Sequence, residues 1–249
     1  IKPSSPLWIN ARIQYALNLN ALERPDEATE MLRGLIEQNP ETSTLSISLG
    51  NVLRCRKDYT GAAQAYSHAI DLIEEIQPGD WSLFYSRGIA YERMGDWAKA
   101  EIDLLQALEL RPDDPQVLNY LGYSWIDQGL NLDRAVDMIR QAVDQRPNDG
   151  FIVDSLGWAY FRLGQFEAAV EELEKAVELR PDDPVINDHL GDAYWRAGRQ
   201  NEARFQWHQA IDLKPDEDQL PKIQAKLESG LPDQTTQQRA DDTHSSNGG

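Results

Sequence analysis

One pattern of glycine, alanine and proline recurs along this chain, and it limits the fold more than any other feature of the sequence. Residues 154–184 read DSLGWAYFRLGQFEAAVEELEKAVELRPDDP, and residues 188–218 repeat the pattern as DHLGDAYWRAGRQNEARFQWHQAIDLKPDED. A glycine with a bulky residue three positions later occurs at Gly50, Gly88, Gly122, Gly157 and Gly191. These glycines are 38, 34, 35 and 34 residues apart. Such a period predicts a stack of similar supersecondary units.

Alanine and proline follow each glycine at nearly constant distances. Twelve residues after the glycine an alanine occurs at Ala62, Ala100, Ala169 and Ala203, with Ala135 displaced by one. A second alanine follows seven residues later, at Ala69, Ala107, Ala142, Ala176 and Ala210, and a proline ends the pattern at Pro112, Pro147, Pro181 and Pro215. Because small residues let two helix backbones approach closely, each period predicts a helical hairpin.

Local signals within the period agree with this prediction. Apolar residues lie at helical spacing, at Leu156, Tyr160, Leu173 and Val177. In the segment RPDDP, Pro181 cannot continue the preceding helix, Asp183 can cap the next one, and Pro184 suits its first turn. The constant residues of the pattern are therefore interpreted as scaffold.

The repeat resembles the tetratricopeptide repeat (TPR), whose usual unit is 34 residues in two antiparallel helices. The resemblance implies an all-α, right-handed superhelical solenoid of six helix hairpins plus a C-terminal capping helix. The six expected repeats are 9–42, 43–80, 81–114, 115–149, 150–183 and 184–217. The first departs from the pattern with Ala16 in place of glycine, the second has four extra residues in DLIEEIQPGD, and the fourth has one extra residue in DQGLNLD.

The two ends of the chain differ from the repeats. Residues 1–8 are expected to be a linker or the remnant of a preceding segment, because the chain opens without methionine and no polar cap precedes residue 9. Residues 218–230 are expected to form the capping helix, with Ile223 and Leu227 on the last repeat and Lys222, Lys226 and Glu228 in water. Residues 231–249 have almost no apolar side chains and are expected to be disordered.

Composition excludes several classes of function. The chain has 42 Asp and Glu against 24 Lys and Arg, a formal charge of −18, which argues against binding nucleic acid or an anionic membrane. No apolar run is long enough to span a membrane. Cys55 is the single cysteine and the four histidines are scattered, so we predict no disulfide, metal site or cofactor. No nucleophile elbow or phosphate-binding loop is present, and we predict no enzyme.

The resemblance also implies where a partner would bind. In this family the first helices of successive repeats line a concave groove, and the groove positions lie six and three before the glycine and one, four and five after it. Large aromatic side chains, acceptors and arginines occupy many of these positions. The candidate partner-binding residues are Tyr85, Asn119, Tyr123, Asp154, Trp158, Phe161, Arg162, Asp188, Asp192, Trp195 and Arg196.

This set favours a protein or peptide partner, because exposed aromatics with arginine are typical of binding hot spots. Three aspartates against two arginines favour a basic segment. The alternative is that Trp158 and Trp195 only pack on neighbouring first helices. A clamp for a chaperone's C-terminal carboxylate is disfavoured, because the groove positions hold no lysine.

Two other functions stay open at this point. The chain could be a self-assembly module that pairs through its first repeat, or an accessory domain of a larger protein. The last repeats are also similar to the C-terminal arrays of envelope-associated TPR proteins from alphaproteobacteria. That resemblance favours the bacterial periplasm or outer membrane over the cytoplasm.

Overall fold

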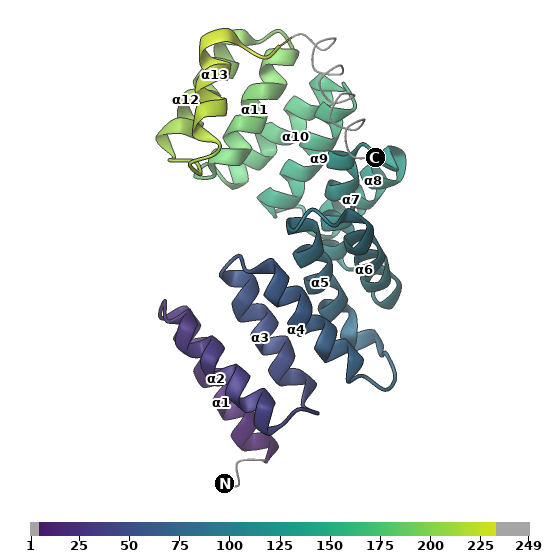
Figure 1. The fold of residues 1–249 in the computed structure, drawn as a ribbon. Coiled ribbons are helices and arrows are strands. Elements are labelled where there is room, and N and C mark those ends of the chain that lie inside the picture. Colours follow the sequence, from purple (N-terminus) through teal and green to yellow (C-terminus); the bar gives the residue numbers. More distant parts are fainter. Residues whose placement is uncertain (1–4, 233–249) are drawn as a thin grey trace. The chain divides into compact units, whose positions relative to one another are not determined.

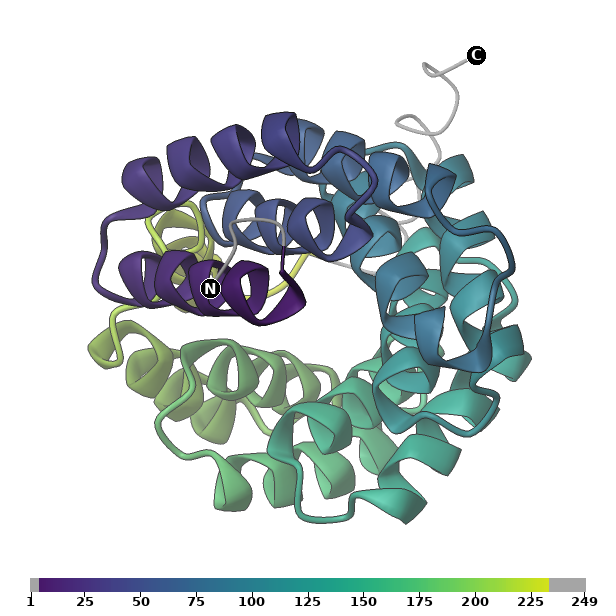
Figure 2. The same cartoon turned by 90° about the horizontal axis from the view of Figure 1, so that it is seen from below.

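The computed structural model describes residues 5–232, and every regular element among them is a helix (Figure 1). The chain divides into two compact parts, an N-terminal half of residues 1–117 and a C-terminal half of residues 118–249. Within each half, a helix runs back alongside its predecessor, as Figures 1 and 2 show. None of the described helices is long and apolar enough to cross a membrane.

The N-terminal half contains α1 to α6. The helices are α1 (Pro6–Ala21), α2 (Pro25–Gln38), α3 (Ser43–Cys55), α4 (Tyr59–Asp71), α5 (Trp81–Arg93) and α6 (Trp97–Leu110). Helix α1 begins three residues before the expected first repeat, because Ser5 caps it by accepting from the Trp8 amide and Pro6 suits its first turn. The extra residues of the second repeat form a turn and a short 3-10 helix, Pro78–Asp80.

The C-terminal half contains most of α7 and all of α8 to α13. The helices are α7 (Pro115–Gln128), α8 (Leu132–Gln145), α9 (Gly150–Arg162), α10 (Phe166–Leu179), α11 (Pro184–Arg196), α12 (Gln200–Asp212) and α13 (Leu220–Ser229). The extra residue of the fourth repeat lies in the turn before α8, where Asn131 has a positive φ of 45°. The division into six repeats stays a prediction, and residues 233–249 of the expected disordered tail lie outside the described residues.

The repeat glycines lie where paired helices cross. A Cβ built on Gly157 of α9 would lie 2.5 Å from Cγ of Leu173 on α10, and one on Gly191 of α11 would lie 2.5 Å from the Trp207 ring on α12. Ala169 and Ala203 are fully buried on the second helix of the same two pairs. The inference from sequence that small residues sit at the helix crossings is confirmed for these pairs.

The cap read from RPDDP also forms. Asp183 Oδ1 accepts hydrogen bonds from the amides of Val185, at 2.9 Å, and Ile186, at 3.1 Å, while Pro184 occupies the first turn of α11. Between α9 and α10 the chain reverses at Gly164, whose φ of +75° is costly for other residues. These local features fix where α9 and α11 begin and end, and so which of their side chains share a face.

Candidate partner-binding surface

The predicted binding residues fall in both halves of the molecule. Tyr85 lies on α5 in the N-terminal half, where its ring is tilted against that of Trp81 at a centroid distance of 6.0 Å. Burial raises the pKa of Tyr85 to about 12, with the nearby Arg54 opposing the shift. The other ten residues lie on α7, α9 and α11 of the C-terminal half. We call Asn119, Tyr123, Asp127, Trp158, Phe161, Arg162, Trp195 and Arg196 the first-helix surface.

Asp154 already has a partner within the chain. Its carboxylate oxygens lie 2.9 and 3.1 Å from Nδ1 of His189 on α11. Both side chains are buried. Burial lowers the pKa of His189, but the charge and hydrogen bond of Asp154, with smaller effects of Asp188 and Asp192, outweigh it and raise the pKa. Asp154 therefore joins α9 to α11 in this structure.

Asp188 and Asp192 share Lys226 of α13. The Lys226 ammonium lies 2.8 Å from carboxylate oxygens of both residues, and Asp192 also accepts from Nε1 of Trp207 at 2.9 Å. The expectation that Lys226 stays in water is wrong, because its side chain is only 19% exposed. Burial raises the pKa of Asp192 to about 6; Lys226 opposes the shift, and Asp188 adds to it.

Trp158 packs against the next first helix on one face. Its ring stacks on His189 of α11 at a centroid distance of 4.2 Å and an interplanar angle of 17°. It also stacks on Phe161 at 4.9 Å, and its Nε1 donates to Asp127 Oδ1 at 3.3 Å. Trp158 is half-buried, so packing on the neighbouring helix accounts for part of its surface and leaves part accessible.

The end of α11 is covered by the residues that follow α13. Gly230 has φ +73° and lies so close to Trp195 that an added Cβ would overlap the indole ring. Arg196 Nη2 donates to the carbonyl oxygen of Pro232 at 2.7 Å. Trp195 is also tilted against Trp207 at 5.4 Å. The segment after α13 therefore covers Trp195 and Arg196, so the accessible part of the first-helix surface lies on α7 and α9.

The α9 end of the surface is more open. Phe161 is half-buried between Trp158 and Phe166, whose ring centroid lies 5.7 Å away. Arg162 is exposed, and its Nη1 lies 3.5 Å from Asp127 Oδ1, the limit of a hydrogen bond. This loose contact leaves both charged groups in reach of a partner.

Asn119 on α7 contributes an amide oxygen that lacks a hydrogen bond. Its Oδ1 is buried and has no partner among the described residues. Asp154 of α9 occupies the position that Asn119 occupies in α7, and it pairs with His189 of the next first helix. The residue that would pair with Asn119 in the same way is Ser155 of α9, but its hydroxyl donates to the Phe151 carbonyl at 2.9 Å. Tyr123, one turn further along α7, is half-buried.

Sequence reasoning missed the bases that pair with the predicted aspartates. The sequence did contain a signal for one of these pairs: Asp154 lies three residues before the repeat glycine Gly157, and His189 lies two residues before the next one, Gly191. The interpretation of the four histidines as scattered did not pair His189 with an aspartate of the neighbouring repeat. Among the described residues, no cluster of three His, Cys, Asp or Glu side chains is arranged to hold a metal ion.

Models of one repeat family match three parts of the chain. A model described as TPR repeat matches residues 157–198. Two models described as tetratricopeptide repeat match residues 81–114 and 16–80. Together the three matches cover more than half of the sequence.

Similar proteins agree with this assignment. The TPR repeat-containing protein PA4667 of Pseudomonas aeruginosa is 35% identical over 92 residues, which are 37% of this chain and only 16% of that protein. Among solved structures, the Cut9–Hcn1 hetero-tetramer of APC/C has a TM-score of 0.75 at 18% identity, over 89% of this chain and 42% of that one. MamA from Desulfovibrio magneticus RS-1 has a TM-score of 0.58 at 22% identity, over 71% and 97%.

A third solved structure has a similar fold. YrrB, described as a TPR protein with an unusual peptide-binding site, has a TM-score of 0.56 at 19% identity, over 79% of this chain and 99% of that one. These likenesses bear on the fold alone, whereas the family models match the residues of the repeat. The chain belongs to the tetratricopeptide repeat family.

Proposed function

We propose that this protein is a non-enzymatic scaffold that binds an extended segment of a partner protein on the α7–α9 part of its first-helix surface. Tetratricopeptide repeats are in general non-catalytic folds that bind proteins or peptides. The observation that carries the proposal is a partly exposed row of aromatic and polar side chains on α9, Trp158, Phe161 and Arg162, with α7 of the neighbouring pair adding the unpaired amide oxygen of Asn119.

An extended segment supplies the groups that this row lacks. Its backbone N–H groups are free to donate, and one of them would satisfy Asn119 Oδ1 once that side chain turns toward the partner, since an unpaired buried acceptor is costly. Its carbonyl groups can accept from Arg162, and its apolar side chains can pack on Phe161 and Trp158. Because these residues lie on preformed helices, only the partner loses conformational entropy on binding.

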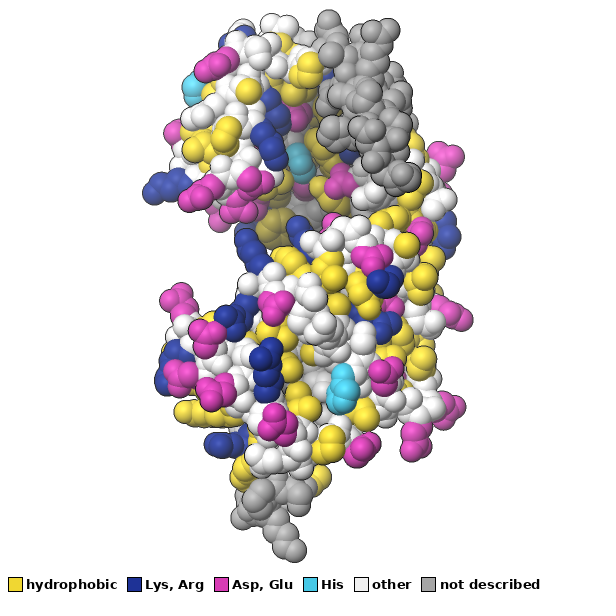
Figure 3. All heavy atoms as spheres, viewed as in Figure 1, with side chains coloured by type: hydrophobic (Ala, Val, Ile, Leu, Met, Phe, Trp, Pro, Cys, Tyr) yellow, Lys and Arg dark blue, Asp and Glu magenta, His cyan; other side chains and the backbone are white. Residues whose placement is uncertain are grey.

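The surface favours recognition of the main chain over recognition of charge. Asp154, Asp188 and Asp192 are paired with His189 and Lys226 and are buried, which leaves Asp127 beside Arg162 as the more exposed charged pair. Acidic side chains are spread over the visible face of the molecule and do not form one patch there (Figure 3). The peptide-binding site named for YrrB supports peptide binding as a use of this fold.

An affinity pull-down with matched variants tests the proposal. The first variant, Asn119→Leu/Arg162→Glu, changes the surface without touching the packed rings. The control, Phe205→Ser, changes an exposed apolar side chain on α12. We expect a partner that binds wild type and the control but is lost from the double variant. A partner retained by the double variant and lost from the control would place binding on the second helices instead.

Self-assembly is a second candidate, supported by the exposed apolar side chains on and just after α1. Leu7 on α1 is 74% exposed, Leu22 at its end 68%, and Tyr15 is also exposed. Apolar side chains gathered on one helix are typical of contact surfaces. The mass in solution should then rise with concentration, and Leu7→Ser/Leu22→Ser should keep the chain monomeric. A concentration-independent monomeric mass would exclude this function.

A further inference from the structure

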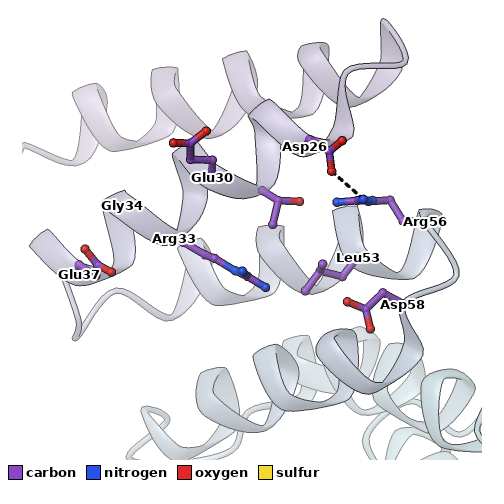
Figure 4. A pocket seen from close by; sticks show the side chains of 9 residues that line it. Asp26, Glu30, Arg33, Gly34, Glu37, Leu53, Arg56 and Asp58 are labelled. Carbon is purple, nitrogen blue, oxygen red and sulfur yellow. Dashed lines mark ion pairs between the residues drawn. The ribbon is translucent and has the colours of Figure 1, made fainter.

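A cavity in the N-terminal half lies apart from the first-helix surface. It has a volume of about 670 Å³ and is formed by α2 together with the end of α3 and the start of α4 (Figure 4). Leu53 of α3 and Thr29 of α2 contribute buried side chains to its lining. The proposed function assigns no role to this cavity.

Thr29 presents an unsatisfied polar group in this lining. The residue is 7% exposed, and its Oγ1 has no hydrogen-bond partner within residues 5–232. A buried hydroxyl without a partner is costly. A ligand that places a donor in the cavity would remove that cost once the Thr29 hydroxyl turns toward it.

Gly34 of α2 keeps the cavity open. A Cβ built on Gly34 would meet no heavy atom of the described chain within 4 Å, although glycine in a helix interior is less stable than alanine. A second cavity, of about 510 Å³ between α1 and α2, is also lined by Gly34 and Glu30. The two hollows thus meet on α2 at a position without a side chain.

The charges around the cavity favour a cation. Its lining includes four carboxylates and two guanidinium groups. Arg56 pairs with Asp26 at 2.7 Å, across the cavity in Figure 4, and this pair is neutral. The remaining acidic residues are Glu30, Glu37 and Asp58, against the single cation Arg33.

We propose that this cavity is a docking site for a lysine or arginine side chain of a partner protein. The cationic N–H groups would donate to Thr29 Oγ1 and to carboxylates of the lining, and the aliphatic stem would lie against Leu53 and Gly34. Acidic wall groups, an unpaired buried acceptor and open space at Gly34 together match such a side chain. The positive charge of Arg33 opposes the binding of a cation, so removing it should increase the affinity for one.

The test is a nuclear magnetic resonance titration of the full chain with N-acetyl-arginine methylamide as the probe. We expect saturable shifts of the backbone amides of Thr29, Gly34 and Leu53 at millimolar probe. The matched N-acetyl-glutamate methylamide should leave these amides unchanged. Saturable shifts with the glutamate probe alone, or with neither probe, would overturn the proposal. Shifts at Arg162 would report on the separate first-helix surface and not on this site.

Three variants give the titration its controls. Gly34→Leu fills the open space and should abolish the shifts, while the thermal midpoint stays at or above that of wild type and rules out unfolding. Glu30→Gln/Glu37→Gln should lower the affinity for the arginine probe by about two- to fivefold, the range expected from exposed ion pairs. Arg33→Ala should raise that affinity by a similar factor. Weaker binding to Arg33→Ala, or unchanged binding to Gly34→Leu, would contradict a cation site in this cavity.

Discussion

Lys226 of α13 lies 2.8 Å from a carboxylate oxygen of Asp192 on α11, and both side chains are largely buried. The same ammonium reaches Asp188 at 2.8 Å. Charges removed from water need a close partner of opposite sign, so this contact fixes where α13 can dock. Helix α13 is therefore joined to α11 by a specific ion pair, and it also buries Ile223.

Replacing Lys226 with methionine should destabilise the C-terminal half by about 3–5 kcal/mol, because two buried carboxylates would lose their cation. The measurement is urea unfolding followed by tryptophan fluorescence. Lys222→Met is the matched control on the same helix, because Lys222 is 62% exposed and its ion pair with Asp218 is long, at 3.8 Å. The control should change the free energy of unfolding by no more than about 0.5 kcal/mol. Equal effects of the two substitutions would contradict a specific role for Lys226.

The titration of Asp192 and His189 should lower the stability of the C-terminal half as the pH rises from 4 to 8. Burial raises the pKa of Asp192 from 3.8 to about 6, so its contribution is largest below 3.8, declines between these two values and is lost above about 6. The pKa of His189 is raised above 6.5, mainly by Asp154 against the effect of burial, so its contribution is lost as pH rises through the folded value. Asp154, Asp188 and Lys226 are the charged groups that face this pair.

Urea midpoints measured between pH 4 and 8 check this dependence. The wild-type midpoint should decrease over that range, and His189→Gln should show a flatter curve above pH 6.5, because the histidine whose pKa is raised by folding is gone. A wild-type midpoint that rises with pH would mean that the ion pairs, and not burial, control the titration of Asp192.

The same substitution, glycine to alanine, should have opposite effects at two helical positions. At Gly157 the new Cβ would lie 2.5 Å from Leu173, which is fully buried, so overpacking should cost about 1–3 kcal/mol. At Gly34 no described atom lies within 4 Å, and the higher helix propensity of alanine should stabilise by about 0.5–1 kcal/mol. Thermal unfolding of both variants measures the difference. A stabilising Gly157→Ala would show that the helix crossing is looser than described.

Gly230→Ala should release the segment after α13 from the end of α11. The residue has φ +73° and ψ −173°, a region nearly restricted to glycine, and its Cβ would overlap Trp195. We expect faster amide hydrogen exchange at Leu231 and a red shift of tryptophan emission as Trp195 becomes accessible. Unchanged exchange at Leu231 would show that the segment tolerates a side chain there.

Much of the local fold could be predicted from the sequence, because each feature depends on neighbouring residues. The glycine at the helix crossing, the Asp183 cap and the Pro184 start are short-range signals that recur at a fixed period. The onset of α1 was missed, since the cap by Ser5 lies before the first repeat and has no counterpart in the pattern.

The candidate site was harder to predict because its contacts join residues about one repeat apart. Position in the repeat placed Asp154 and Asp188 in the groove, but it did not indicate the basic side chains, His189 and Lys226, that neutralise them. The opposite case is Asn119, whose oxygen is unpaired because the next repeat has Ser155 in place of a base. Such differences become visible only when adjacent repeats are set side by side.

The central claim is that a partner lies against α9 at the first-helix surface. Once the pull-down has named a partner, the most direct measurement is photo-crosslinking from a benzoylphenylalanine placed at Arg162, with Phe205 on α12 as the matched exposed position. We predict a crosslink from position 162 to one short segment of the partner and none from position 205. A crosslink from position 205 alone would contradict it and move the binding surface to the second helices.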